Sequence, residues 1–166
     1  KIFTAHTEPQ NFEPTPLRDI IIDESLVDEK FYLTKEMEEK FNYLRGPKKI
    51  VRKTADGHKY YFSEGGMSPT DSLELPGRTM LTSEGSINRS THIIEVNGRK
   101  RFLTPIECER LNGFYDDWTY GMSDRMRYFC MGNALVVDLI KTIGNRIEEI
   151  ETQTSNETEL VQLKLL

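Results

Sequence analysis

The chain has 166 residues, of which 37% are hydrophobic and 30% are charged. This length suits one ordinary domain, or one small domain together with pieces of another. No apolar run approaches the roughly 20 residues that a membrane helix needs, and a formal net charge of −5 argues against general affinity for nucleic acid. Cys108 and Cys130 are far apart and form no C-x-x-C pattern, so a reducing compartment is expected.

Positive charge is concentrated in two segments. Residues 45–59 hold six basic residues against one acid, and residues 78–101 hold five against two. The acids gather in residues 19–39 and after Ile147. Two basic segments between acidic ends favour a protein that meets phosphate on one face, although a solvated surface of mixed charge gives the same counts.

The N-terminal third predicts a lead-in and one helix. Lys1–Pro16 contains three prolines among polar residues and reads as a linker. Leu17–Ile22 is a short apolar segment. Thr34 is suited to cap a helix over Lys35–Leu44, and Gly46-Pro47 ends it.

The middle of the chain predicts a small β region with long polar loops. Two hairpins are expected from β-rich runs, at Ile50–Thr54 with His58–Phe62 and at His92–Val96 with Arg99–Leu103. Asn97-Gly98 joins the second pair, and both residues tolerate the positive φ that a two-residue turn needs. Between the hairpins, Ser63–Arg89 is rich in Gly, Ser, Thr and Pro, with a strand expected at Thr79–Thr82.

Three helices are expected after Thr104. Thr104-Pro105 begins a helix that Gly113 ends, and Ser123 caps a second helix that runs through Cys130. Gly132-Asn133 is expected to open the last helix. Aliphatic residues recur along that helix at spacings of three and four: Val136, Ile140, Ile143, Ile147 and Ile150.

Two further expectations concern this last helix, one for its C-terminal end and one for its apolar face. Its last turn is acidic, which opposes the helix dipole and predicts fraying near Glu151. A small β region offers little to cover the aliphatic face. Either the tail folds back over it, or, as we favour, the helix belongs to a core whose other members are not on this chain.

No constellation of catalytic or metal-binding residues is visible. Asp116-Asp117 are neighbours on a loop, where two carboxylates rarely point at one substrate atom. His6, His58 and His92 match no metal-ligand spacing. Both cysteines lie in amphipathic or apolar runs that predict packing and not nucleophilic chemistry. We therefore expect no catalytic residue and no metal site on this chain.

The segment Arg78–Ser90 has the residue types of a DNA-reading loop. Arg78 and Arg89 suit bidentate contacts with guanine, Asn88 suits adenine, and Glu84 suits the amino group of cytosine. Hydroxyl groups and glycine amides suit phosphate. An ordinary polar surface loop has a similar composition, so the segment alone leaves both interpretations open.

Two longer stretches resemble a known family. Arg101–Thr119 resembles the ninth conserved motif of DNA cytosine-5 methyltransferases, and Gly132–Ile140 resembles their tenth. Arg78–Ile94 looks like the end of the family's target-recognition region, including the pair Thr79-Met80. One departure is Tyr115, where the family commonly has proline. The family's Pro-Cys, Glu-Asn and Phe-x-Gly-x-Gly-like motifs are absent from this sequence.

The resemblance implies an α+β fold, in which a small β-rich target-recognition domain is followed by C-terminal helices that belong to a Rossmann-like methyltransferase core. It implies four parts: a linker from a catalytic domain (1–16), a DNA-reading domain (17–100), a returning segment (101–151) and a flexible tail (152–166). In the family, a cysteine attacks C6 of a flipped cytosine, and C5 then accepts the methyl group of S-adenosylmethionine.

The resemblance also assigns roles to particular residues. The DNA-binding set is Arg78, Thr79, Thr82, Ser83, Glu84, Gly85, Asn88, Arg89 and Ser90, with Thr79 holding a phosphate. Gly132, Asn133 and Ala134 would close the S-adenosylmethionine pocket, and Arg101, Glu107 and Arg110 would organise the recognition region. The implied partners are double-stranded DNA and a catalytic domain or subunit, without a membrane, in a bacterial or phage cytoplasm. By itself the chain is then expected to be inactive.

Two alternatives remain beside this hypothesis. One is a stand-alone DNA-binding module without catalysis, which predicts sequence-specific binding by the chain alone. The other is a subunit-interaction domain that uses the apolar helix, which predicts no DNA affinity. The basic segments disfavour the second alternative, and the unpartnered apolar helix disfavours the first.

Overall fold

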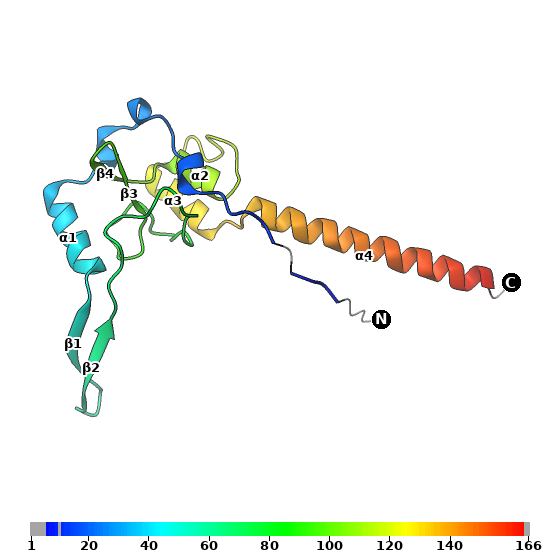
Figure 1. Cartoon of the computed structure of the whole chain (residues 1–166), viewed down its shortest axis with the longest axis horizontal. Coiled ribbons are helices and arrows are strands. Elements are labelled where there is room, and N and C mark those ends of the chain that lie inside the picture. The colour runs from blue at the N-terminus through cyan, green and yellow to red at the C-terminus, as the bar shows by residue number, and fades with distance from the viewer. Residues whose placement is uncertain (1–5, 10, 165–166) are drawn as a thin grey trace. The chain divides into compact units, whose positions relative to one another are not determined.

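The structure is a computed structural model that describes residues 6–9 and 11–164, with side chains up to residue 154 (Figure 1). The chain divides into two compact units. The larger unit spans residues 14–134, and the smaller one comprises the residues before 14 and after 134. The predicted α+β class is confirmed, because helices accompany two small antiparallel sheets.

The larger unit contains three α-helices, three short 3-10 helices and four strands. In chain order these are η1 (Leu17–Asp19), η2 (Glu24–Leu26), η3 (Glu29–Phe31), α1 (Lys35–Arg45), β1 (Lys48–Lys53), β2 (Lys59–Glu64), β3 (Ile93–Val96), β4 (Arg99–Phe102), α2 (Pro105–Leu111) and α3 (Asp124–Asn133). Strand β1 pairs with β2, and β3 pairs with β4, each in antiparallel register. Both predicted hairpins are therefore confirmed.

Local side-chain chemistry accounts for the element boundaries. The Thr34 hydroxyl accepts a hydrogen bond from the Met37 backbone at 3.3 Å and begins α1. Thr104 and Glu107 form a capping box at the start of α2. In the β3–β4 turn, Asn97 and Gly98 have φ of 51° and 77°, as the two-residue turn requires.

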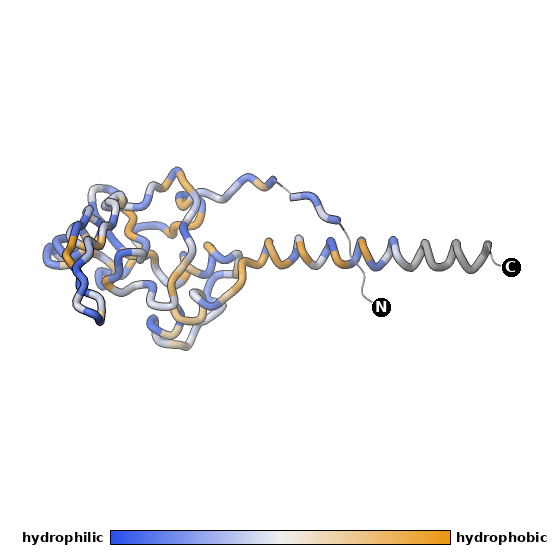
Figure 2. The backbone as a smooth tube through the Cα atoms, turned by 90° about the horizontal axis from the view of Figure 1, so that it is seen from below, coloured by the Kyte–Doolittle hydropathy of each residue, from blue (hydrophilic) through white to orange (hydrophobic). Residues whose placement is uncertain are grey.

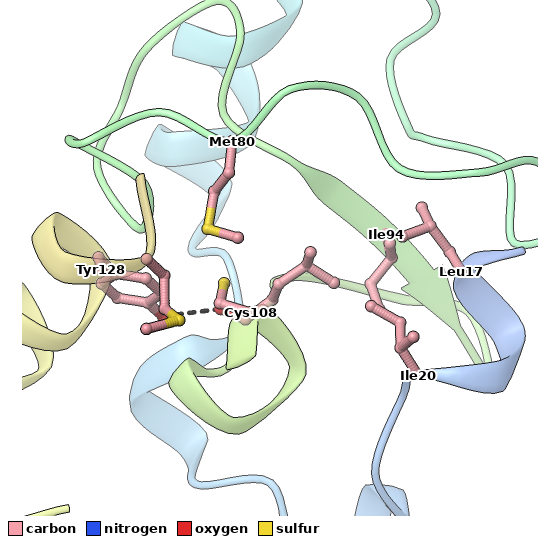
Figure 3. Packing of buried hydrophobic residues seen from close by; sticks show 8 residues of the cluster. Leu17, Ile20, Met80, Ile94, Cys108 and Tyr128 are labelled. Carbon is pink, nitrogen blue, oxygen red and sulfur yellow. Dashed lines mark hydrogen bonds between the residues drawn. The ribbon is translucent and has the colours of Figure 1, made fainter. Parts of the chain in front are cut away.

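The main core of the larger unit joins segments that are distant in the sequence (Figure 3). Leu17 from η1, Ile94 from β3 and Cys108 from α2 pack together and are almost fully buried. Met80 and Tyr128 extend the cluster, and the Tyr128 hydroxyl donates to the Leu103 carbonyl at 2.7 Å. The segment after Gly77 is thus fixed between the second hairpin and α3.

Two predicted elements in this unit are wrong. Thr79–Thr82 is not a strand, because the backbone N–H of Leu81 bonds to the Glu84 carboxylate at 3.1 Å and not to a neighbouring strand. Gly132-Asn133 does not open the last helix. Both residues end α3, which runs three residues beyond the predicted end at Cys130, and Ala134 is extended.

The smaller unit is built on α4 (Val137–Lys164), in which hydrophobic residues recur along the helix (Figure 2). The predicted end near Glu151 is wrong, since the helix continues to Lys164. The aliphatic side chains of Ile140, Ile143 and Ile147 are 43%, 48% and 53% exposed. Arg146 donates to the His6 carbonyl at 3.2 Å. Over the described residues, no helix combines the length and apolarity needed to cross a membrane.

Candidate nucleic-acid interface

A half-buried carboxylate anchors both ends of the predicted reading loop. Asp71 accepts hydrogen bonds from Arg78 Nε at 2.8 Å, from Arg45 Nη2 at 3.0 Å and from the Ile93 backbone at 2.9 Å. Burial alone would raise the pKa of Asp71, but these hydrogen bonds outweigh it and hold the pKa below its ordinary value. Arg78 also donates to the Ser90 carbonyl at 2.9 Å, which closes the loop across its base.

The structure corrects the interpretation of Arg45 as part of an exposed basic segment. Arg45 is 1% exposed, and its guanidinium donates to the Ser68, Pro69 and Thr91 carbonyls as well as to Asp71. Neither Arg45 nor Asp71 stood out in the sequence. Arg45 does lie four residues after the buried Phe41, on the same face of α1. This spacing is the one sequence signal that indicates burial of Arg45.

Glu84 and His92 form a second internal support. Glu84 is 4% exposed, and its Oε1 accepts from the His92 backbone at 2.6 Å. The His92 ring is fully buried, and its Nε2 accepts from the Arg78 backbone at 2.9 Å. This arrangement favours a supporting role for Glu84 over direct reading of a base.

The other predicted loop residues fall into two groups. Asn88 and Arg89 are used within the chain: Asn88 Oδ1 accepts from the Ser90 backbone at 3.0 Å, and Arg89 Nε donates to the Leu44 carbonyl at 3.1 Å. By contrast, Thr79, Thr82 and Ser83 are exposed. In this conformation the loop therefore presents hydroxyl groups more freely than it presents arginines.

A groove of about 1110 Å³ runs along the exposed part of this loop. Loop residues 82–87 line it together with residues of η3, α1, β4 and α3 and the N-cap of α3, which are Lys30, Phe31, Met37, Phe102, Ser123, Asp124, Arg125, Met126, Tyr128 and Phe129. Gly85 has φ of 76°, and a Cβ there would lie 2.3 Å from the Tyr128 ring. Only glycine therefore lets the loop pack so closely against α3.

The three residues predicted to organise this region form internal ion pairs. Arg101 and Glu107 are fully buried and joined by two hydrogen bonds of 2.8 Å, and Glu24 also accepts from Arg101 at 2.6 Å. Burial alone would lower the pKa of Arg101, but its two carboxylate partners raise it. Arg110 pairs with Asp116 at 2.7 Å and donates to the Ile20 carbonyl at 3.2 Å.

A further buried carboxylate was missed in the sequence. Glu109 is fully buried and accepts from the Thr119 backbone at 3.0 Å and from Arg127 at 2.9 Å. Burial acts to raise the pKa of Glu109, but the hydrogen bonds from Thr119 and Arg127 lower it. These contacts fix the loop between α2 and α3 on which Trp118 and Tyr120 are exposed.

The predicted cofactor turn is placed at the end of α3. A Cβ on Gly132 would lie 2.4 Å from the Leu81 backbone, so this glycine serves a close approach within the chain. Asn133 is exposed, and its Nδ2 donates to the Phe129 carbonyl at 2.8 Å. Ala134 is half-buried and packs against the core, so Asn133 is the most exposed member of the turn.

The Cys108 thiol lies away from solvent. Burial, the largest effect, raises the pKa of Cys108, and nearby carboxylates raise it further, so the thiol stays protonated. The prediction that Cys108 packs in the core is confirmed. Within the described part of the chain, no three His, Cys, Asp or Glu side chains gather as metal ligands.

Comparisons with known proteins agree on one family. The family model described as C-5 cytosine-specific DNA methylase matches residues 4–149. The type II methyltransferase M.Sau3AI of Staphylococcus aureus is 61% identical over 163 residues, which is 98% of this chain and 39% of the relative. M.DsaV of Dactylococcopsis salina is 27% identical over 142 residues, or 86% of this chain and 38% of that relative. The chain thus spans about two fifths of the curated relatives it matches.

A solved methyltransferase structure shares the fold of this chain. The structure titled as the methyltransferase EhMeth of Entamoeba histolytica superimposes with a TM-score of 0.50. The match covers 82% of this chain and 41% of that one at 15% identity. At this identity the likeness concerns the fold alone.

Proposed function

The chain belongs to the C-5 cytosine-specific DNA methylase family, and from that premise we propose that it reads the DNA sequence and completes the cofactor pocket of a DNA (cytosine-5) methyltransferase. The reaction would transfer a methyl group from S-adenosylmethionine to C5 of a flipped cytosine. The reactive cysteine would come from the segment that carries the Pro-Cys motif, which this sequence lacks.

One observation carries the reading role: the loop is braced from inside while its hydroxyl groups face outward. Asp71 and Glu84 hold the loop through hydrogen bonds that are partly or fully buried, so little ordering is needed when DNA binds. Thr79, Thr82 and Ser83 are exposed along the loop. Thr79 would bind a backbone phosphate, and Thr82 and Ser83 would approach the base edges.

The exposed aliphatic face of α4 supports the second part of the proposal. Ile140, Ile143 and Ile147 lie on one side of the helix at spacings of three and four. Residues 101–151 would return the chain to a Rossmann-like core made mostly by a catalytic part. Residues 17–100 would then form the DNA-reading domain, residues 1–16 the linker, and residues 152–166 a tail.

The chain would supply only one edge of the S-adenosylmethionine pocket. When bound, S-adenosylmethionine supplies an electrophilic methyl group. Asn133 is exposed and Ala134 is half-buried, and both would line that edge, since the side-chain amide of Asn133 can both accept and donate hydrogen bonds. Gly132 would position the edge by its contact with Leu81.

The proposal is tested by assembly with a catalytic part that carries the Pro-Cys and Glu-Asn motifs, supplied in the same chain or as a partner. The assembly is expected to methylate cytosine at one DNA sequence, whereas the chain alone transfers no methyl group. Methyl transfer is measured with labelled S-adenosylmethionine on a panel of duplexes. A folded assembly that methylates nothing overturns the proposal.

A paired substitution tests the reading loop separately. Thr82→Ala with Ser83→Ala is expected to reduce discrimination between cognate and mismatched duplexes by about tenfold or more, because each base pair that is no longer read correctly costs about 1–3 kcal/mol. Ser68→Ala with Thr152→Ala removes two exposed hydroxyls elsewhere and serves as the control. Sequence-specific binding by the chain alone would favour a stand-alone DNA-binding module instead.

A further inference from the structure

The two faces of the β1–β2 hairpin differ in charge. Side chains alternate between faces along each strand, so the register assigns every residue to one side. One side, which we name the lysine face, carries Lys49, Val51, Lys53, Lys59, Tyr61 and Ser63. It has three lysines and no acid. The opposite face carries the ion pair between Lys48 and Glu64, with Nζ and Oε2 3.1 Å apart.

The lysine face is exposed to solvent. Every residue from 49 to 61 is exposed, and the hairpin extends away from the rest of its unit (Figure 1). In the part of the chain that the structure describes, Lys49, Lys53 and Lys59 form no ion pair with a carboxylate. Lys49 lies 5.0 Å from the Tyr61 ring centroid, and Tyr61 itself is 66% exposed.

The register also contains an unfavourable pair. Lys53 and Lys59 lie directly opposite each other across the two strands. Like charges in this position destabilise a ribbon, and an isolated two-stranded hairpin is only marginally stable. An external polyanion would relieve the repulsion.

We propose that the lysine face is a separate arm that binds the phosphate backbone of duplex DNA, an inference that rests on the DNA-reading function proposed above. Lys49 and Lys53 are four residues apart, about 14 Å along an extended strand, which is close to the roughly 12 Å width of the major groove. The face holds no Arg, Asn or Gln, and the lysine ammonium is a compact point charge that suits phosphate, without the planar fork of arginine. The arm therefore adds affinity and salt dependence without adding sequence specificity.

The test measures DNA binding by the complete enzyme, with the catalytic part present. Lys49→Gln, Lys53→Gln and Lys59→Gln together are expected to weaken binding on the order of 10- to 100-fold at about 0.1 M salt, equally for cognate and unrelated duplexes. The slope of log K against log salt should become shallower by about 2–3, at about 0.9 for each phosphate that is no longer neutralised. The methylated sequence stays the same.

A matched control removes the same charge elsewhere. Lys35→Gln, Lys40→Gln and Arg52→Gln neutralise two exposed lysines of α1 and one arginine on the opposite face of the hairpin. This variant should change the salt slope by less than about 1. An equal loss of affinity in both variants would mean that only overall charge matters, and would overturn the assignment to the lysine face.

A second variant separates DNA binding from folding. Lys53→Glu places an acid opposite Lys59, so it should leave the melting temperature unchanged or higher while it weakens DNA binding more than Lys53→Gln does. If Lys53→Glu weakens DNA binding and also lowers the melting temperature, the loss of binding follows from a less stable hairpin. The arm is then structural and the inference is wrong.

The outcomes distinguish this inference from the proposed function. If the parent enzyme binds and methylates DNA and the triple variant keeps its affinity and slope, the inference fails and the proposed function stands. If the parent enzyme does not bind duplex DNA, the proposed function fails and the inference fails with it. If the triple variant loses assembly with the catalytic part and not DNA affinity, the hairpin binds protein and the inference is overturned.

Discussion

At the scale of single residues, buried charges connect segments that are far apart in the sequence. Glu107 accepts from the Ile22 backbone at 3.0 Å and from Arg101, while Arg101 also holds Glu24. Removing one member of such a set leaves the others charged, buried and unpaired, which costs more than the loss of an exposed pair. The contribution of these residues is therefore tested one partner at a time.

Arg101→Ala is expected to lower the free energy of unfolding by about 3–5 kcal/mol, because Glu107 would remain buried without its cation. Arg99, two residues earlier on the same strand, pairs with Glu29 at the surface, and Arg99→Ala should cost less than about 1 kcal/mol. Urea denaturation followed by circular dichroism measures both variants. Similar losses for the two arginines would contradict the structural role of Arg101.

Gly132→Ala and Gly144→Ala should shift stability in opposite directions. A Cβ at Gly132 meets the Leu81 backbone, so this change is expected to cost about 1–3 kcal/mol. A Cβ on Gly144 in α4 meets nothing within 4 Å, so alanine there should strengthen the helix by about 0.5–1 kcal/mol. Thermal melting compares the two. A neutral Gly132→Ala would show that the α3 end and the loop do not approach as closely.

At the scale of elements, the hairpins and α4 differ in how their surfaces are covered. Hairpin β3–β4 contributes Ile94 to the core, whereas hairpin β1–β2 is exposed from residue 49 to 61. Helix α4 carries an aliphatic stripe that is about half exposed. Exposed aliphatic stripes of this kind are typical of surfaces that bind another part of a protein.

The stripe on α4 predicts a specific assembly defect. Ile143→Asp with Ile147→Asp should reduce association with the catalytic part by about 100-fold or more, because two charges would enter an apolar contact. Asn145→Asp adds an acid at an exposed polar position of the same helix and should have little effect. Association is measured by analytical ultracentrifugation or calorimetry. If the double variant assembles as tightly as the parent chain, α4 does not contribute to the contact with the catalytic part.

At the scale of the whole molecule, carboxylates with lowered pKa predict acid sensitivity of the larger unit. The pKa values of Asp71 and Glu109 both lie below their ordinary values of 3.8 and 4.5. A carboxylate with a depressed folded pKa contributes stability above its unfolded pKa, and the contribution is lost as pH falls through the folded pKa. Stability should be level above about pH 5 and fall by roughly 1–3 kcal/mol toward pH 2.

Denaturation at a series of pH values measures this fall, with Asp56→Asn as the control. Asp56 lies in the exposed turn between β1 and β2, so its loss should leave the pH dependence unchanged. An unfolding free energy that stays constant down to about pH 3 would contradict the role of Asp71 and Glu109.

The sequence by itself determined most of the local elements and the family. Hydrophobic spacing, Thr34 and Thr104 as caps and the Asn97-Gly98 turn located α1, α2 and the second hairpin, because these signals act within a few residues along the chain. The motif-like stretches at 101–119 and 132–140 indicated the family that the comparisons show.

Only the tertiary structure decided which polar residues face inward. Arg45, Glu84 and Glu109 look like surface residues in the sequence, yet each is buried by partners from other segments. It also decided the role of Gly132, which lies within α3 and packs against the backbone of Leu81, about 50 residues earlier. A residue's local pattern carries no information about which distant group will satisfy its charge or occupy the space beside it.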